Sequence, residues 1–151
     1  MARSSRMDAM TAAAQTPATS TAPKGIRLFN ALIGVTTLGI FLQAITAGEF
    51  VSQEHREGWI AAHNIIADVT IVVALVTAIV GLVLVRATDR ILAWFGLVLF
   101  VLLLVQTALG HLITEGEADA WIGVHVPLAF VIVGLAVWLS VRGAQVRRRS
   151  A

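Results

Sequence analysis

Four long apolar stretches determine what this chain can fold into. They cover about residues 28–48, 59–85, 91–113 and 121–141. A helix needs roughly 20 mostly apolar residues to cross the hydrocarbon core of a membrane, and each stretch reaches that length. The chain is 58% hydrophobic and 13% charged, far too apolar for a soluble domain of 151 residues. We therefore predict an all-α membrane protein, a bundle of four transmembrane helices.

The rest of the chain consists of two tails and three short loops. Residues 1–26 are rich in Ala, Thr, Ser and Pro, so we predict that they form a disordered cytoplasmic tail. The bundle is expected over residues 27–142, and residues 143–151 form a basic cytoplasmic tail. No stretch is left over that could form a soluble domain.

Basic residues gather on one side of the predicted membrane spans. Of ten Arg and one Lys, only Arg56 lies outside the N-terminal segment up to Arg27, the loop 86–90 and the C-terminal segment from Arg142. The other two loops contain six Asp and Glu residues. The positive-inside rule then predicts a multi-pass protein of the bacterial plasma membrane with both termini in the cytoplasm. The arginines act as a topology signal, and no nucleic-acid partner is expected.

The second half of the chain repeats the first. LQAITAG, ten residues and WIAAH in the first half match VQTALG, ten residues and WIGVH in the second. Three residue pairs are each 62 positions apart: Gly48 and Gly110, Trp59 and Trp121, His63 and His125. Both repeats start on the same side, so we predict two parallel helical hairpins related by an axis along the membrane normal.

The repeat predicts a polar layer in the outer half of the membrane. At a rise of 1.5 Å per residue, His63 and His125 lie about 6 Å below the outer interface, and Gln43 and Gln106 lie roughly 6–8 Å deep. Ala67 and Ala129 follow the histidines by one helical turn on the same faces. These small side chains leave room for a flat molecule between the second and fourth helices, although small residues also serve close helix packing.

Three functions fit this layer. The first is a b-type haem with His63 and His125 as axial metal ligands, because facing helices of a bundle commonly build cofactor sites. The second is a quinone or small-metal site made of the same His and Gln groups. The third is purely structural, with Gln and His forming hydrogen bonds between helices. The chain has no Cys, which excludes disulfides, Fe–S clusters and covalently attached c-type haem.

The histidine pair resembles one half of the heme A synthase family. Those enzymes consist of two fused four-helix halves, each with a histidine at the outer end of its second and fourth helices, and one half holds a b-type haem by both. The likeness covers residues 28–141. The chain also looks like small four-helix bacterial membrane proteins with a Gln in helices 1 and 3 and a His-Pro-like start to helix 4, here His125-Val126-Pro127.

The chain departs from that family in ways that bear on activity. It has one half only, it lacks the family's loop cysteines, and Ile60 stands where a catalytic carboxylate would be expected before His63. We therefore expect haem binding, with electron transfer or haem handling, and no enzymatic activity of its own. Candidate partners are the lipid bilayer, a membrane redox protein or quinone, and a second copy of the chain.

Three other polar groups, Arg56, Asp68 and His111, could take part in the site. Arg56 could pair with a haem propionate on the outer side. Asp68, about 13 Å deep by helical rise, is a proton relay or partner contact, or else a neutral carboxyl bonded to a neighbour. It shares a helix side with Asn64 and lies away from the face of His63. His111 is a further ligand or proton donor, or else an ordinary surface histidine like His55.

Overall fold

The computed structural model describes residues 23–115 and 119–150, and these residues are almost entirely helical. The four long helices are α2 (Lys24–Ser52), α3 (Glu57–Val80), α4 (Arg90–Glu115) and α5 (Ile122–Arg149). A π-helical segment, η1 (Gly81–Val85), extends α3, and a 3₁₀ turn, η2 (Asp119–Trp121), precedes α5. Each long helix, α3 together with η1, is long and apolar enough to cross a membrane.

The predicted spans lie inside longer helices. The helix α2 begins at Lys24 and so includes residues 24–26, which we had assigned to the tail; Pro23, as its N-cap, has the fixed φ suited to a helix start. The helix α5 runs to Arg149, through most of the predicted basic tail. A hydropathy boundary marks where apolar side chains end, whereas a helix continues into water while its backbone hydrogen bonds are made. The first 22 residues of the predicted disordered tail lie outside the described part.

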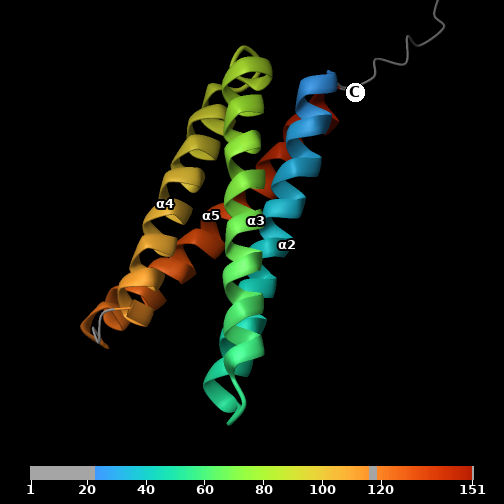
Figure 1. Ribbon diagram of the computed structural model, residues 1–151. Coiled ribbons are helices and arrows are strands. Elements are labelled where there is room, and N and C mark those ends of the chain that lie inside the picture. Colours follow the sequence, from blue (N-terminus) through green and yellow to red (C-terminus); the bar gives the residue numbers. More distant parts are fainter. Residues whose placement is uncertain (1–22, 116–118, 151) are drawn as a thin grey trace, which may run out of the picture.

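The helices form two arms. In Figure 1, α2 and α3 lie side by side along their length, and α4 and α5 form the second arm. Each helix contacts two others: α2 contacts α3 and α5, and α4 contacts α3 and α5. Among the described residues α3 and α5 do not contact one another directly, so they occupy diagonal positions in the bundle. The arms meet near the described N-terminus and diverge toward the other end (Figure 1).

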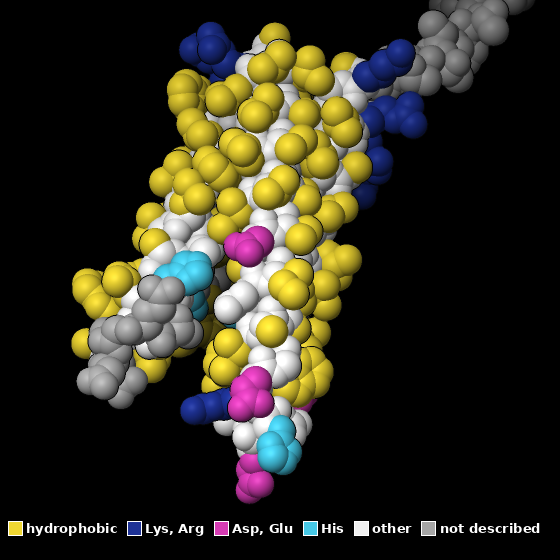
Figure 2. All heavy atoms as spheres, viewed as in Figure 1, with side chains coloured by type: hydrophobic (Ala, Val, Ile, Leu, Met, Phe, Trp, Pro, Cys, Tyr) yellow, Lys and Arg dark blue, Asp and Glu magenta, His cyan; other side chains and the backbone are white. Residues whose placement is uncertain are grey.

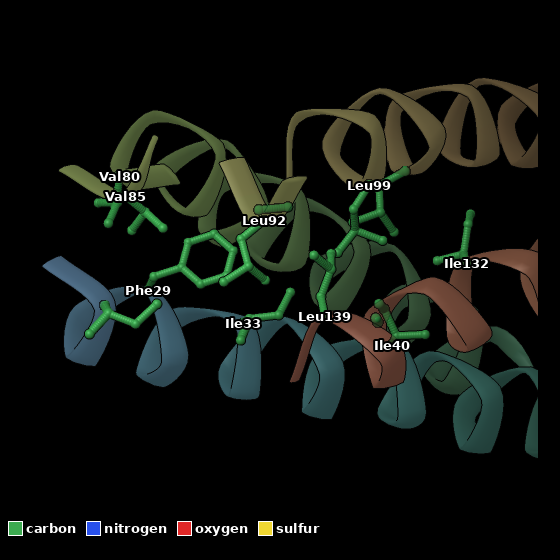
Figure 3. Close-up of a cluster of buried hydrophobic side chains, with 13 residues drawn as sticks. Phe29, Ile33, Ile40, Val80, Val85, Leu92, Leu99, Ile132 and Leu139 are labelled. Carbon is green, nitrogen blue, oxygen red and sulfur yellow. The ribbon is translucent and has the colours of Figure 1, made fainter. Parts of the chain in front are cut away.

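The hydrophobic core lies in the half of the bundle nearer the basic residues, which we call the basic end. Phe29 of α2 and Leu92 and Leu99 of α4 are among its fully buried side chains (Figure 3). The core contains residues 26–40 of α2, 74–85 of α3 and η1, 92–103 of α4 and 132–139 of α5. The opposite half, which we call the far end, contributes little to this core.

Polar contacts reinforce the basic end. Asn30 Nδ2 donates to the Gly143 carbonyl at 2.9 Å, which ties α2 to α5. Asp89 joins α4 to α5: one oxygen accepts from the Leu92 backbone N–H and the other from Arg142, each at 2.9 Å. The Asn30 bond therefore joins the two arms at this end, and the Asp89 contacts join the two helices of the second arm.

The two helices of the first arm approach closely at Gly39. A Cβ at this position would overlap Thr70 Oγ1 and lie 3.1 Å from Thr70 Cγ2. At the basic end, a Cβ on Gly25 would lie 2.8 Å from the Leu84 Cβ. Small residues at such contacts let helices pack at short distance in an apolar environment. The first arm is thus closely packed over most of its length.

Candidate functional site

A cleft separates the two arms at the far end. Figure 2 shows it as a hollow between the arms, with histidine side chains at its walls. The surface along the middle of both arms is mainly hydrophobic, and acidic groups appear toward the far end (Figure 2). The hydrophobic core lies in the other half of the bundle, so few buried side chains fill the space between the arms at this end.

Each predicted glutamine contacts a predicted histidine. Gln43 Nε2, from α2, donates to the backbone carbonyl of His63 in α3 at 2.5 Å. Gln106 Nε2, from α4, donates to the backbone carbonyl of His125 in α5 at 3.0 Å. The same side-chain-to-backbone bond therefore joins the two helices within each arm. Because the amides bind the histidine backbone, both imidazole rings remain available for other contacts.

The imidazole ring of His63 contacts two residues of α2, Thr46 and Phe50. Its Nδ1 lies 3.0 Å from Thr46 Oγ1. That hydroxyl also lies 3.0 Å from the Leu42 carbonyl and 3.1 Å from the Gln43 carbonyl, to either of which it can donate. A hydroxyl that donates to one of these carbonyls is free to accept a hydrogen bond from His63 Nδ1. The Phe50 ring packs edge-on against the imidazole, with 5.3 Å between ring centroids.

His125 lacks such a partner. Its Nδ1 is buried and has no hydrogen-bond partner, and the same is true of Gln106 Oε1. The ring lies over Gly110, where an added Cβ would be 3.6 Å from His125 Cε1. Both histidines are partly buried. No hydrogen bond to Nε2 of either ring occurs among the described residues.

The remaining predicted site residues are placed as follows. Ala67 and Ala129 are partly buried, one turn beyond their histidines. Arg56 is exposed and precedes the first residue of α3. Figure 2 shows a basic side chain at the mouth of the cleft, and Arg56 is the only Lys or Arg at that end among the described residues. An anionic group in the cleft would therefore meet a cation at the mouth.

Asp68, Asn64, His55 and His111 are all exposed. Asp68 and Asn64 lie one turn apart on α3, and Figure 2 shows an acidic side chain surrounded by hydrophobic ones partway along this helix. His63 on the same helix is partly buried, so the carboxylate and the imidazole lie on different sides of α3. These four residues are therefore peripheral to the histidine pair.

Within residues 23–115 and 119–150, no three His, Cys, Asp or Glu side chains come together in a way that could hold a metal ion. The described site thus offers two imidazoles and no compact ligand cluster. Two imidazoles are the complete protein ligand set of a six-coordinate haem iron, whereas small metal ions commonly need three or four protein ligands.

Sequence reasoning missed Thr46, Phe50 and the asymmetry between the two rings. Thr46 lies three residues after Gln43, on the same face of α2, and that spacing could have identified it. The corresponding position after Gln106 is Leu109, a buried apolar residue. No protein-family model, curated protein or solved structure matches this chain.

Proposed function

We propose that this protein is a membrane-spanning b-type haem protein that binds the haem between its two arms, close to the outer face of the membrane. His63 and His125 are its axial ligands. A haem iron held by two imidazoles supplies one-electron transfer. The protein accordingly serves electron transfer or haem handling.

The surface of the helices supports insertion in a membrane. Large hydrophobic side chains are exposed along all four helices; Val83 is 72% exposed and Phe130 75%. Water would disfavour such a surface, whereas lipid tails accommodate it. With the basic end in the cytoplasm of a bacterial cell, the cleft opens toward the outer face.

The observation that carries the haem proposal is the 3.0 Å contact between His63 Nδ1 and Thr46 Oγ1. A neutral imidazole has one proton, so a proton on Nδ1 leaves the Nε2 lone pair unprotonated. Metal-bound histidines typically donate their other ring N–H to a neighbour, which fixes tautomer and orientation. In this proposal Thr46 accepts the Nδ1 proton of His63 and so favours the tautomer that a metal ligand needs.

Further features of the cleft fit a haem. The unpartnered Nδ1 of His125 and Oε1 of Gln106 are buried polar atoms of the kind that a missing group or water would satisfy. Gly110 leaves space beside the His125 ring. Arg56 is exposed, and in this proposal it pairs with an anionic propionate of the haem.

A purely structural role for the histidine rings has less support. The bonds that join helices within each arm use the histidine carbonyls, so other residue types at 63 and 125 could make them. A quinone remains the alternative ligand for the same cleft, because its oxygens could accept from a ring N–H. Spectroscopy separates the two, since only haem gives a Soret band.

The first test is the spectrum of the wild-type protein. We expect protein purified in detergent from haem-supplemented cells to show a Soret band and near-stoichiometric haem by pyridine extraction. The reason is that two imidazoles can fill both axial positions of the iron. Protein that is folded by circular dichroism, yet contains no haem and gains none on titration with hemin, would rule the proposal out.

The second test concerns orientation. A reporter enzyme active only outside the cytoplasm should give signal when inserted in the loop between α4 and α5, because the basic segments retain the opposite end in the cytoplasm. The same reporter in the loop 86–89 should be silent and serves as the control. Activity in the reverse pattern would place the cleft at the cytoplasmic face.

A further inference from the structure

We infer that the two histidines of the cleft are unequal: His63 is the fixed ligand of the haem, and His125 is a releasable one that a small external molecule can replace. This inference rests on the proposed haem function and assigns the site a second kind of ligand. The candidate molecules are neutral ligands of ferrous haem, of which carbon monoxide is the usual probe.

The environment of His63 holds its ring in place. Thr46 accepts from Nδ1 at 3.0 Å, and Phe50 packs against the ring edge with 5.3 Å between centroids. Both residues belong to α2, which packs closely against α3 from Gly25 to Thr46. Rotation of the His63 ring would break a hydrogen bond and an aromatic contact together. The ring is thus oriented in advance for a ligand at Nε2.

Among the described residues, the His125 ring has neither a hydrogen bond to its Nδ1 nor an aromatic contact. The residue that corresponds to Thr46 is Leu109, which has no hydroxyl and is only 9% exposed. Nδ1 of His125 is accordingly buried without a partner. Beside the ring lies Gly110, which has no side chain to restrict it. The internal repeat therefore supplies an equivalent histidine without the equivalent support.

The difference in hydrogen bonding affects how well each ring can bind iron. A metal ligand needs an unprotonated Nε2, so the single proton of a neutral imidazole must be on Nδ1. At His63 that proton is already there and is bonded to Thr46. At His125 a proton on Nδ1 would be a buried donor without an acceptor, which is unfavourable. The proton therefore belongs on Nε2 in the empty site, and coordination by His125 is weakened.

An incoming molecule would exploit that weakness. If haem is bound, release of His125 Nε2 would leave a position for the incoming ligand, one bond replacing the other without transfer of an electron. The freed imidazole would move its proton from Nδ1 back to Nε2, so no proton would be gained or lost. The cleft opens to the surface (Figure 2), which gives a small molecule a route to this position.

The first experiment uses the protein without haem. Nitrogen-15 NMR of histidine-labelled protein distinguishes the two neutral tautomers at neutral to mildly alkaline pH. We expect His63 as the Nδ1–H form and His125 as the Nε2–H form. Thr46→Val, which keeps the side-chain shape and removes the hydroxyl, should abolish the preference at His63. Identical tautomers at the two histidines in the wild type would overturn the inference whether or not haem binds.

The second experiment uses haem-loaded, reduced protein and carbon monoxide. We expect a carbon monoxide adduct in the wild type, and at least tenfold weaker binding in Leu109→Thr, where a hydroxyl at the position that corresponds to Thr46 would support the Nδ1–H of His125. Leu109→Val has the same shape as Thr without the hydroxyl and should bind like the wild type. His125→Ala should keep its haem and bind carbon monoxide more tightly.

The outcomes separate the two proposals. Wild-type protein that contains haem but refuses carbon monoxide, while His125→Ala accepts it, would overturn the inference and leave the proposed function standing. Equal carbon monoxide affinity in Leu109→Thr and Leu109→Val would also overturn it. Protein without haem would contradict the proposed function itself.

Discussion

Replacement of His63 by Ala should deprive the protein of its haem. In the proposed site Thr46 accepts the Nδ1 proton of His63 at 3.0 Å, so the Nε2 of His63 is the better prepared of the two ligands. Its loss leaves only His125, whose Nδ1 has no partner. We expect hemin affinity to fall at least tenfold, which corresponds to about 1.4 kcal/mol or more. Hemin titration followed by the Soret band measures this directly.

Two histidines serve as controls for that experiment. His55 and His111 are exposed, and their Ala variants should retain both the haem and its spectrum. Because the Gln43 amide binds the backbone carbonyl of residue 63, the His63→Ala protein keeps this helix contact and should fold. Undiminished haem in folded His63→Ala protein would show that the ligand lies elsewhere.

Replacement of Phe29 by Ala should produce the largest loss of stability. Phe29 is fully buried, and its ring lies near Leu92 (Figure 3). A Cβ added at Gly81 or Gly96 would lie 3.2 or 3.3 Å from Phe29 Cε2. In water-soluble cores such a change costs about 3–5 kcal/mol. The surrounding lipid is itself apolar, so only the packing part is lost, and we expect about 2 kcal/mol. Equilibrium unfolding of detergent-solubilised protein with added SDS gives the free energy.

The matched control is Phe41→Ala on the same helix. Phe41 is 49% exposed, so its removal should change the free energy of unfolding by less than about 0.5 kcal/mol. If the two variants lost equal stability, the core at the basic end would not be what holds the arms together. A selective effect of Phe29→Ala would locate the joint between the arms at that end.

The helices were predictable because lipid imposes a simple requirement on sequence. Every backbone polar group must be satisfied inside the membrane, so an apolar stretch of sufficient length becomes a helix. All four predicted spans lie within helices of the structure. Their ends were less predictable, because the extension of α5 to Arg149 depends on backbone hydrogen bonds that continue after the apolar residues stop.

The site was predictable in its residue types and less so in its contacts. The repeat identified His63, His125, Gln43 and Gln106, and the structure pairs each Gln with its own His through the backbone carbonyl. The part played by Thr46 depends on which way one hydroxyl points, and spacing alone does not determine that.

The concentration of buried side chains at the basic end has a consequence for dynamics. Opening the far halves of the arms exposes few of the residues that stabilise the bundle, so it needs much less free energy than global unfolding. Backbone amides near the cleft should therefore exchange their hydrogens long before those around Phe29. The far halves of the arms can then separate by local opening while the joint at the basic end stays closed.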